Sequence, residues 1–355
     1  MRDLITRTLV LLVATVMIGT MLVNTTNNSS AMNMTTEDNP LLANWEGPFG
    51  GVPPFDRVQI PLFKPALEAG MAEQLAEIQR IANDPAPPDF ENTIVALERT
   101  GKTLDRVGTL YGVWAATMAS PDYQLVQREM APRLAAFQDQ ITQNEALFKR
   151  IEAVYNSPAK AKLNPEQQRL TWLYYTNFVR AGARLNADSK KRLSQINQQL
   201  AGLYTKFSQN VLAEETDQFL VLKSEEELAG LPQSLRDAAA SAAEAKKQQP
   251  GTWVIMNTRS SIDPFLSYSD RRDLREKAWR MFVNRGDNGG EHDNNAIITE
   301  ILQLRAERAK LLGFPTHAHW RLENSMAKTP EKAMELMEAV WKPAVARVHE
   351  EVADM

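Results

Sequence analysis

The stretch that decides the fold is IITEILQLRAERAKLLGFPTHAHWRLENSMAKTP, residues 297–330. It begins as an Arg-bearing amphipathic helix, and the run Leu311-Leu312-Gly313-Phe314 supplies a helix stop, because glycine commonly follows the last helical turn. Met326 to Pro330 then opens a second helix, since proline is favoured in the first turn. This order of helix, stop and helix predicts that the region is built from consecutive helices.

The chain before this stretch repeats the same pattern. Apolar residues recur at spacings of three and four, which places them on one helical face. Proline-rich turns separate the segments. Helices are expected at 67–82 with an end at Asn83, from 89–92 to about 111, from Pro121 to about 148, from Pro165 to about 180, and at 193–212.

Two short apolar runs interrupt the helices. Residues 218–222 and 252–256 are too short for independent helices and flank an Ala-rich helix at about 235–247, so we expect them to form a small β element. Helical periodicity returns at 270–282 and again at 330–355. The last pattern reaches Met355 without a helix stop, which indicates a chain cut in mid-helix. The predicted fold class is mainly α.

The N-terminus has the features of an export signal. Arg2 and Arg7 precede an apolar run at 9–23, and small residues follow near Ala31. We therefore expect residues 1–31 to be a signal peptide that directs export to the periplasm. The alternative is an uncleaved membrane anchor formed by residues 9–23, although about 20 residues are needed to cross a bilayer. Residues 32–62 are expected to be an irregular lead-in.

Composition narrows the class of protein. Of the 355 residues, 43% are apolar and 24% are charged, which is typical of a folded chain. The net charge of −4 gives no basic surface for nucleic acid. The absence of cysteine excludes disulfides and thiolate metal ligands.

The four histidines do not form a zinc motif. A zinc peptidase helix needs His at i and i+4 with Glu at i+1, but His349 is followed by Glu350 and, at i+4, by Ala353. His317 and His319 are expected at a helix start, where residues two apart point in different directions. His292 lies in a Gly-rich acidic loop that matches no calcium motif and is expected to be solvated. No catalytic, cofactor-binding or metal-binding residue is assigned.

Two further features have ordinary structural interpretations. The loop glycines Gly286, Gly289 and Gly290 lack the Lys-Ser/Thr ending of a phosphate-binding loop and are expected to form turns. An aromatic cluster could line a peptide groove, but aromatic residues in helices are more often part of the core. The cluster consists of Trp172, Tyr174, Tyr175 and Phe178.

Several blocks together resemble the thimet oligopeptidase family of zinc metallopeptidases. They are LLGF at 311–314, MAKTP at 326–330, FENTI at 90–94, NEALFKRI at 144–151, ELAGLP at 227–232, and the block from Trp253 to Arg285. The MAKTP block is most similar to the bacterial peptidyl-dipeptidase branch. The resemblance implies a helical ellipsoid divided by a channel, of which residues 63–355 would supply the N-terminal half.

The resemblance also implies a function. Members of this family use zinc to hydrolyse short peptides, and the peptidyl-dipeptidase branch removes C-terminal dipeptides. Because the zinc motif has not appeared by Met355, this chain is expected to bind no zinc, to be inactive alone, to expose apolar surface and to have the missing C-terminal half as its partner. The alternatives are an endo-acting oligopeptidase and a non-catalytic helical protein that binds peptides or acts as a scaffold.

Overall fold

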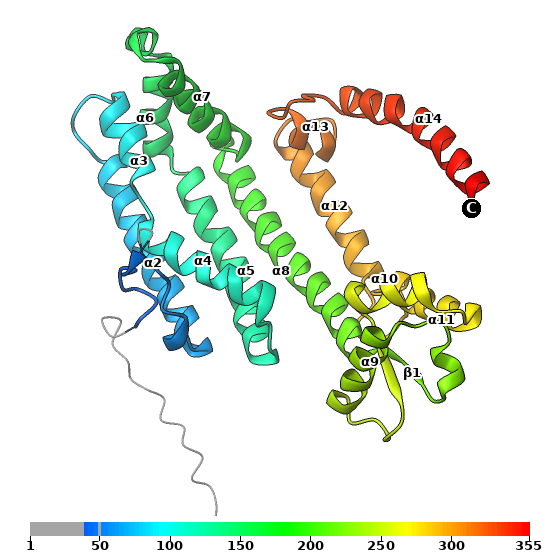
Figure 1. Ribbon diagram of the computed structural model, residues 1–355. Helices are drawn as coiled ribbons and strands as arrows, with labels where there is room; N and C mark the ends of the chain where they lie inside the picture. Colours follow the sequence, from blue (N-terminus) through cyan, green and yellow to red (C-terminus); the bar gives the residue numbers. More distant parts are fainter. Residues whose placement is uncertain (1–38, 49–50) are drawn as a thin grey trace, which may run out of the picture.

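The computed structural model describes residues 39–48 and 51–355 as a series of helices with one small sheet (Figure 1). The predicted signal or anchor at 1–31 lies outside the described residues. The mainly α fold class is confirmed. The longer elements are α2 (Ile60–Ala82), α4 (Lys102–Thr117), α5 (Pro121–Thr142), α6 (Glu145–Asn156), α7 (Pro165–Arg180), α8 (Ala187–Asp217), α9 (Gln233–Ala245), α10 (Arg259–Tyr268), α11 (Arg272–Val283), α12 (Asn295–Leu311), α13 (His317–Leu322) and α14 (Pro330–Asp354).

Helices α2 to α7 form the N-terminal bundle. Phe63 and Leu67 of α2 are buried against Leu110 of α4 and Met130 of α5 in one apolar cluster. A second cluster lies at the other end of α2, where Ile78 packs with residues of α5, α6 and α7. Helix α2 begins at Ile60, earlier than the expected end of the lead-in at 62, because Pro61 provides a favourable first turn.

Two expected helices are each divided by a turn. The segment expected from 89–92 to 111 forms a π-helical turn (Phe90–Val95), the short α3 (Ala96–Glu98) and then α4. Gly101 separates them with φ +76°, and its N–H donates to Glu77 Oε2 at 2.8 Å. The helix expected from Pro121 to about 148 ends at Thr142, and Asn144 caps α6 by accepting from the N–H of Leu147.

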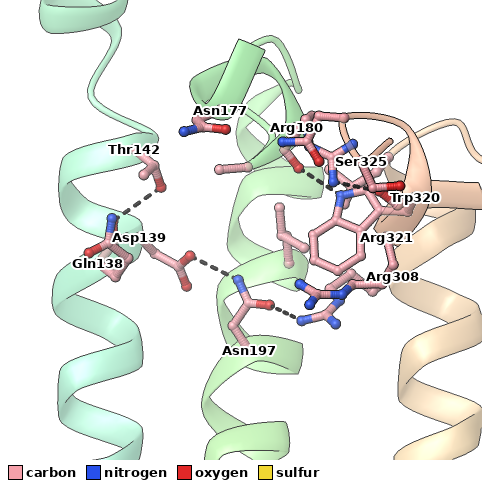
Figure 2. A pocket seen from close by; sticks show the side chains of 14 residues that line it. Gln138, Asp139, Thr142, Asn177, Arg180, Asn197, Arg308, Trp320, Arg321 and Ser325 are labelled. Carbon is pink, nitrogen blue, oxygen red and sulfur yellow. Dashed lines mark hydrogen bonds between the residues drawn. The ribbon is translucent and has the colours of Figure 1, made fainter. Parts of the chain in front are cut away.

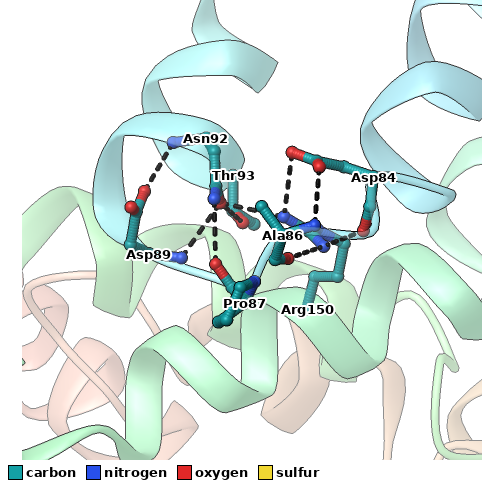
Figure 3. A network of polar contacts seen from close by, with 7 residues as sticks. All are labelled: Asp84, Ala86, Pro87, Asp89, Asn92, Thr93 and Arg150. Carbon is teal, nitrogen blue, oxygen red and sulfur yellow. Dashed lines mark hydrogen bonds and ion pairs between the residues drawn. The ribbon is translucent and has the colours of Figure 1, made fainter.

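Arg150 ties the proline-rich turn after α2 to helix α6 (Figure 3). Its Nη1 donates to the carbonyls of Asp84 at 2.8 Å and Ala86 at 3.0 Å, and its Nη2 donates to Asn92 Oδ1 at 2.9 Å. Asp89 and Asn92 also cap each other's backbone N–H groups. The buried guanidinium therefore satisfies backbone carbonyls that the prolines leave outside any helix.

Helix α8 links the bundle to a second group of elements. It packs along α5 and continues to the sheet, where β1 (Phe219–Leu222) pairs antiparallel with β2 (Trp253–Met256), Phe219 opposite Met256. The predicted β element and Ala-rich helix are thus confirmed. Helix α10 was not expected. It is held by burial of Ile262 and Phe265 in the core around the sheet.

The Gly-rich loop after α11 is anchored to α8. Glu214 is buried, and its Oε2 accepts from the N–H of Gly286 and, at 3.0 Å, from Asn288 Nδ2. Asn210 Nδ2 donates to Asn294 Oδ1 at 2.9 Å. The glycines form turns as expected, and this loop directs α12 back alongside α8.

Helices α12, α13 and α14 confirm the helix, stop and helix pattern. Gly313 ends α12 with φ +81°, Thr316 caps α13, and Thr329 caps α14. Helix α14 extends away from the rest of the protein (Figure 1), and none of its residues is buried. Within residues 39–48 and 51–355, no helix combines the length and apolarity needed to cross a membrane.

Candidate functional site

A pocket of about 610 Å³ lies where α5, α7, α8, α12 and α13 meet (Figure 2). Its position follows from the fold, since α8 packs against α5 on one side and α12 on the other, and α13 closes one end against α7. Its polar lining includes Asp139, Asn197, Arg308, Arg321, Asn324 and Ser325, and Trp320, Leu193 and Leu312 add apolar surface.

Asp139 provides a buried carboxylate. It comes from α5 and is only 6% exposed, because α8 covers this side of the helix. Asn197 Nδ2 donates to Asp139 Oδ1 at 2.8 Å, whereas Oδ2 is buried without a hydrogen-bond partner among the described residues. Burial raises the pKa of Asp139, and the amide of Asn197, the nearby hydroxyl of Ser194 and the charge of Arg308 partly oppose this effect. One carboxylate oxygen is therefore available to a donor inside the pocket.

Arg308 provides the opposite charge from α12. Its Nη1 donates to Asn197 Oδ1 at 3.2 Å, and its guanidinium lies 4.5 Å from the centre of the Trp320 ring. Its Nε is buried without a partner in the described part of the chain. Burial lowers the pKa of Arg308, and the charges of Arg305 and Arg321 lower it further. A single amide, that of Asn197, thus connects the partly buried guanidinium to the buried carboxylate.

Arg180 at the end of α7 fixes α13 over the pocket. It forms an ion pair with Glu323 and donates to the carbonyl of Trp320. In return, Trp320 Nε1 donates to the Arg180 carbonyl at 3.2 Å. These reciprocal bonds position the Trp320 ring, which forms one wall of the pocket.

His317 and His319 lie at the start of α13, and their side chains are in different environments. His319 Nδ1 is 2.8 Å from Thr316 Oγ1, within the helix cap. The His317 ring lies 5.5 Å from that of Trp320, and its Nδ1 is buried without a partner among the described residues. Burial lowers the pKa of His317 to about 4, with further lowering by Arg308, so this ring is neutral at pH 7.

The remaining histidines lie far from this pair in the fold. His292 is in the loop beside Glu291, with Nε2 3.6 Å from Oε1, and His349 is exposed on α14. Within residues 39–48 and 51–355, no three His, Asp or Glu side chains gather as metal ligands. The donor groups of this part of the chain do not fit a zinc site, which needs three or four convergent ligands.

Most of the aromatic cluster belongs to the core. Phe178 is buried, and Tyr174 and Tyr175 pack against the apolar cluster around Ile78. Trp172 is half-buried, with the Arg169 guanidinium 3.9 Å from its ring centre. These side chains are accounted for by packing, and none of them lines the pocket.

The pocket residues were not identified from the sequence. Asp139, Asn197, Arg308 and Trp320 are far apart in the chain, and no local motif joins them. The only signal in the sequence is a carboxylate near the C-terminal end of α5, two residues after Phe137 and two before Ile141. A single helical stripe would leave that position in solvent, but α5 is covered on two sides.

Comparison with known proteins identifies the class to which this helical chain belongs. Residues 265–355 match the model of peptidase family M3, and the chain belongs to this family. The stretch at 297–330, including Arg308 and Trp320, lies inside the matched region.

Curated relatives extend the match over most of the chain. The chain is 34% identical over 317 residues to the dipeptidyl carboxypeptidase of Salmonella typhimurium, covering 89% of this chain and 46% of the relative. It is 34% identical over 320 residues to the dipeptidyl carboxypeptidase of Escherichia coli, covering 90% and 47%. It is 28% identical over 321 residues to oligopeptidase A of Salmonella typhimurium, covering 89% and 46%. The chain thus spans about half the length of these relatives.

Proposed function

We propose that this chain is the N-terminal portion of a zinc-dependent peptidase that removes dipeptides from the C-termini of short peptides. The observation that carries the proposal is the 34% identity, over 89% of the chain, to a protein named dipeptidyl carboxypeptidase. The MAKTP block at 326–330, which resembles the same branch, agrees with it.

The hydrolytic groups, in this proposal, come from residues outside those described. A metal-dependent hydrolase needs convergent ligands and a base, and the described residues contain no such ligand group. The chain supplies instead a rigid helical framework on which the remainder of the protein packs.

The test is a fusion of this chain to the C-terminal portion of the Escherichia coli relative, taken from the end of the matched region. The fusion is incubated with zinc and a hexapeptide that has either a free or an amidated C-terminus, and products are identified by mass spectrometry. We expect dipeptides from the free peptide and none from the amidated one. A fusion that unfolds cooperatively and binds stoichiometric zinc, yet releases no dipeptide, contradicts the proposal.

An endo-acting oligopeptidase is the second candidate. The observation in its favour is the match to oligopeptidase A, which covers the same 89% of the chain at 28% identity. Internal cleavage of the amidated hexapeptide would identify this activity, because an endopeptidase does not need a free C-terminal carboxylate.

A non-catalytic peptide-binding protein is the candidate from another class. The pocket between α5 and α13, with its unpaired carboxylate oxygen, is the feature that favours it. Sequencing of the coding region after Met355 separates the two classes. A His-Glu-x-x-His helix supports the peptidase, and an in-frame stop supports the binding protein.

We also propose that residues 1–31 direct export to the periplasm. The support is the order of Arg2 and Arg7, an apolar run and small residues in the sequence. Cell fractionation followed by N-terminal sequencing tests this. A periplasmic product that begins near residue 32 agrees with it, membrane retention of the intact N-terminus indicates an anchor at 9–23, and a cytoplasmic product with an intact N-terminus contradicts export.

A further inference from the structure

We propose that the pocket between α5, α8, α12 and α13 binds a short zwitterion, an amino acid or a dipeptide. Asp139 would hold the ligand ammonium, and Arg308 with Arg321 would hold its carboxylate. The proposal rests on the pocket itself and does not require the proposed peptidase activity.

The first feature that favours this ligand is the buried carboxylate of Asp139. Asp139 is 94% buried, since only 6% of it is exposed, and its Oδ2 has no hydrogen-bond partner among the described residues. An unpaired buried polar atom destabilises the folded state, and more so when it is charged. A ligand N–H donor placed in the pocket removes that cost, and an ammonium does so with the strongest bond.

The second feature is the pair of guanidinium groups of Arg308 and Arg321. Arg308 has a buried Nε without a described partner, and Arg321 lines the same pocket. Within residues 39–48 and 51–355, the Arg321 guanidinium makes no ion pair or hydrogen bond, whereas Arg180 is already paired with Glu323. The pocket thus offers two guanidiniums to a carboxylate, which they bind well because their fork geometry matches its two oxygens.

The position of both charges selects a zwitterion over a simple anion or cation. Asn197 bonds to Asp139 on one side and to Arg308 on the other, so one amide spans the distance between opposite charges (Figure 2). A plain anion would meet repulsion from Asp139, and a plain cation would meet repulsion from Arg308. A ligand with an ammonium at one end and a carboxylate at the other satisfies both.

Size and shape agree with a ligand of this length. The volume of about 610 Å³ is in the range that takes small molecules and exceeds the needs of a single ion. Trp320, Leu193 and Leu312 provide apolar surface for a ligand side chain. If the complete protein releases dipeptides, its own products belong to the class of ligand that this pocket accepts.

The experiment measures binding of L-alanyl-L-alanine to the full chain by isothermal titration calorimetry, alongside its N-acetylated and C-amidated forms. We expect saturable binding of the free dipeptide and a loss of about tenfold or more with either cap, because each cap removes one charge-assisted contact. Absence of saturable binding, or equal affinity for all three compounds, overturns the proposal. Free alanine and a tetrapeptide, titrated in the same way, set the preferred ligand length.

Two variants test which residue binds each end of the ligand. Asp139→Asn should weaken binding of the free dipeptide but leave the N-acetylated form unchanged, because the ammonium is then already absent. Arg321→Gln should weaken binding of the free and N-acetylated forms but leave the amidated form unchanged. Since Arg321 is exposed, this variant is expected to fold even if Asp139→Asn does not. Asp122→Asn on α5 and Arg347→Gln on α14 are matched exposed controls. Equal losses for every compound would assign a structural role to Asp139 and Arg321 and overturn the proposal.

Discussion

Arg150 links the turn after α2 to helix α6. It is buried, and it donates to the carbonyls of Asp84 and Ala86 and to Asn92. Arg150→Ala removes the buried side chain and leaves three acceptors in a partly exposed turn without their donor, so we expect it to lower the free energy of unfolding by about 1–3 kcal/mol. Urea denaturation followed by circular dichroism measures this change. Lys149→Ala, an exposed neighbour, should change it by less than about 0.5 kcal/mol.

His317 should make stability depend on pH. Its pKa in the folded state is lowered to about 4, below the value of about 6.5 expected for an unfolded chain. The unfolded chain therefore binds a proton first as pH falls, and stability is lost between about pH 6.5 and 4. After allowance for solvent screening, we expect a loss of about 1 kcal/mol over this window.

The effect of His317 is measured by comparing how the stability of two proteins changes with pH. The free energies of unfolding of the natural chain and of His317→Asn are compared at pH 7 and at pH 4.5. The natural chain should lose more stability than the variant across the interval. His349→Asn, which alters an exposed histidine, should follow the natural chain. An identical pH dependence for the natural chain and His317→Asn would show that His317 titrates normally.

Sequence patterns can identify candidate site residues only when those residues belong to a local motif. The four histidines could be assessed one by one because the spacing required by a zinc helix is local. Asp139 and Arg308 could not, since neither is unusual within its own helix and their relation depends on how α5, α8 and α12 pack. Burial of Asp139 follows from a helix covered on two sides, which a single apolar stripe does not indicate.

The loop between α11 and α12 depends on two glycines in different ways. Both Gly286 and Gly289 have positive φ, at +77° and +71°. A Cβ at Gly286 would meet Asn294 Nδ2 at 2.8 Å, whereas one at Gly289 would meet no atom within 4 Å. Gly286→Ala should therefore cost about 2–3 kcal/mol and Gly289→Ala about 1 kcal/mol, since only the first adds a steric clash to the backbone strain.

Thermal unfolding of the two variants checks this difference, and each serves as the other's control. Gly286→Ala should have the lower Tm and should also expose the loop to faster amide exchange, because the bond from Gly286 to Glu214 is disturbed. Equal Tm values for the two variants would mean that Asn294 moves aside at little cost.

The elements themselves were largely predictable, and the errors have a common cause. Periodicity identified α2, α7, α8, α12 and the two strands, because each has a long apolar stripe or a compact apolar run with clear ends. It joined segments across Gly101 and across Asn144, where the apolar spacing continues through a turn. It missed α10, whose burial of Ile262 and Phe265 against the sheet is a tertiary effect.

The whole molecule exposes an apolar surface on α14. Leu336 and Trp341 are 68% and 71% exposed, and Met337 and Val340 lie beside them on the same helix. An apolar surface of this kind favours association, so we expect the chain to form concentration-dependent oligomers in sedimentation velocity experiments. Leu336→Lys combined with Trp341→Lys should reduce association. The control Glu338→Gln should not, and a chain that stays monomeric at all concentrations contradicts the prediction.

In the proposed peptidase, this chain supplies a helical framework, and the hydrolytic groups lie outside its described residues. The most direct test compares zinc content and peptide hydrolysis of the purified chain with those of its fusion to the C-terminal portion of the Escherichia coli relative. We expect no stoichiometric zinc and no dipeptide release by the chain alone, and both in the fusion. Peptide hydrolysis with stoichiometric zinc by the chain alone would contradict this expectation.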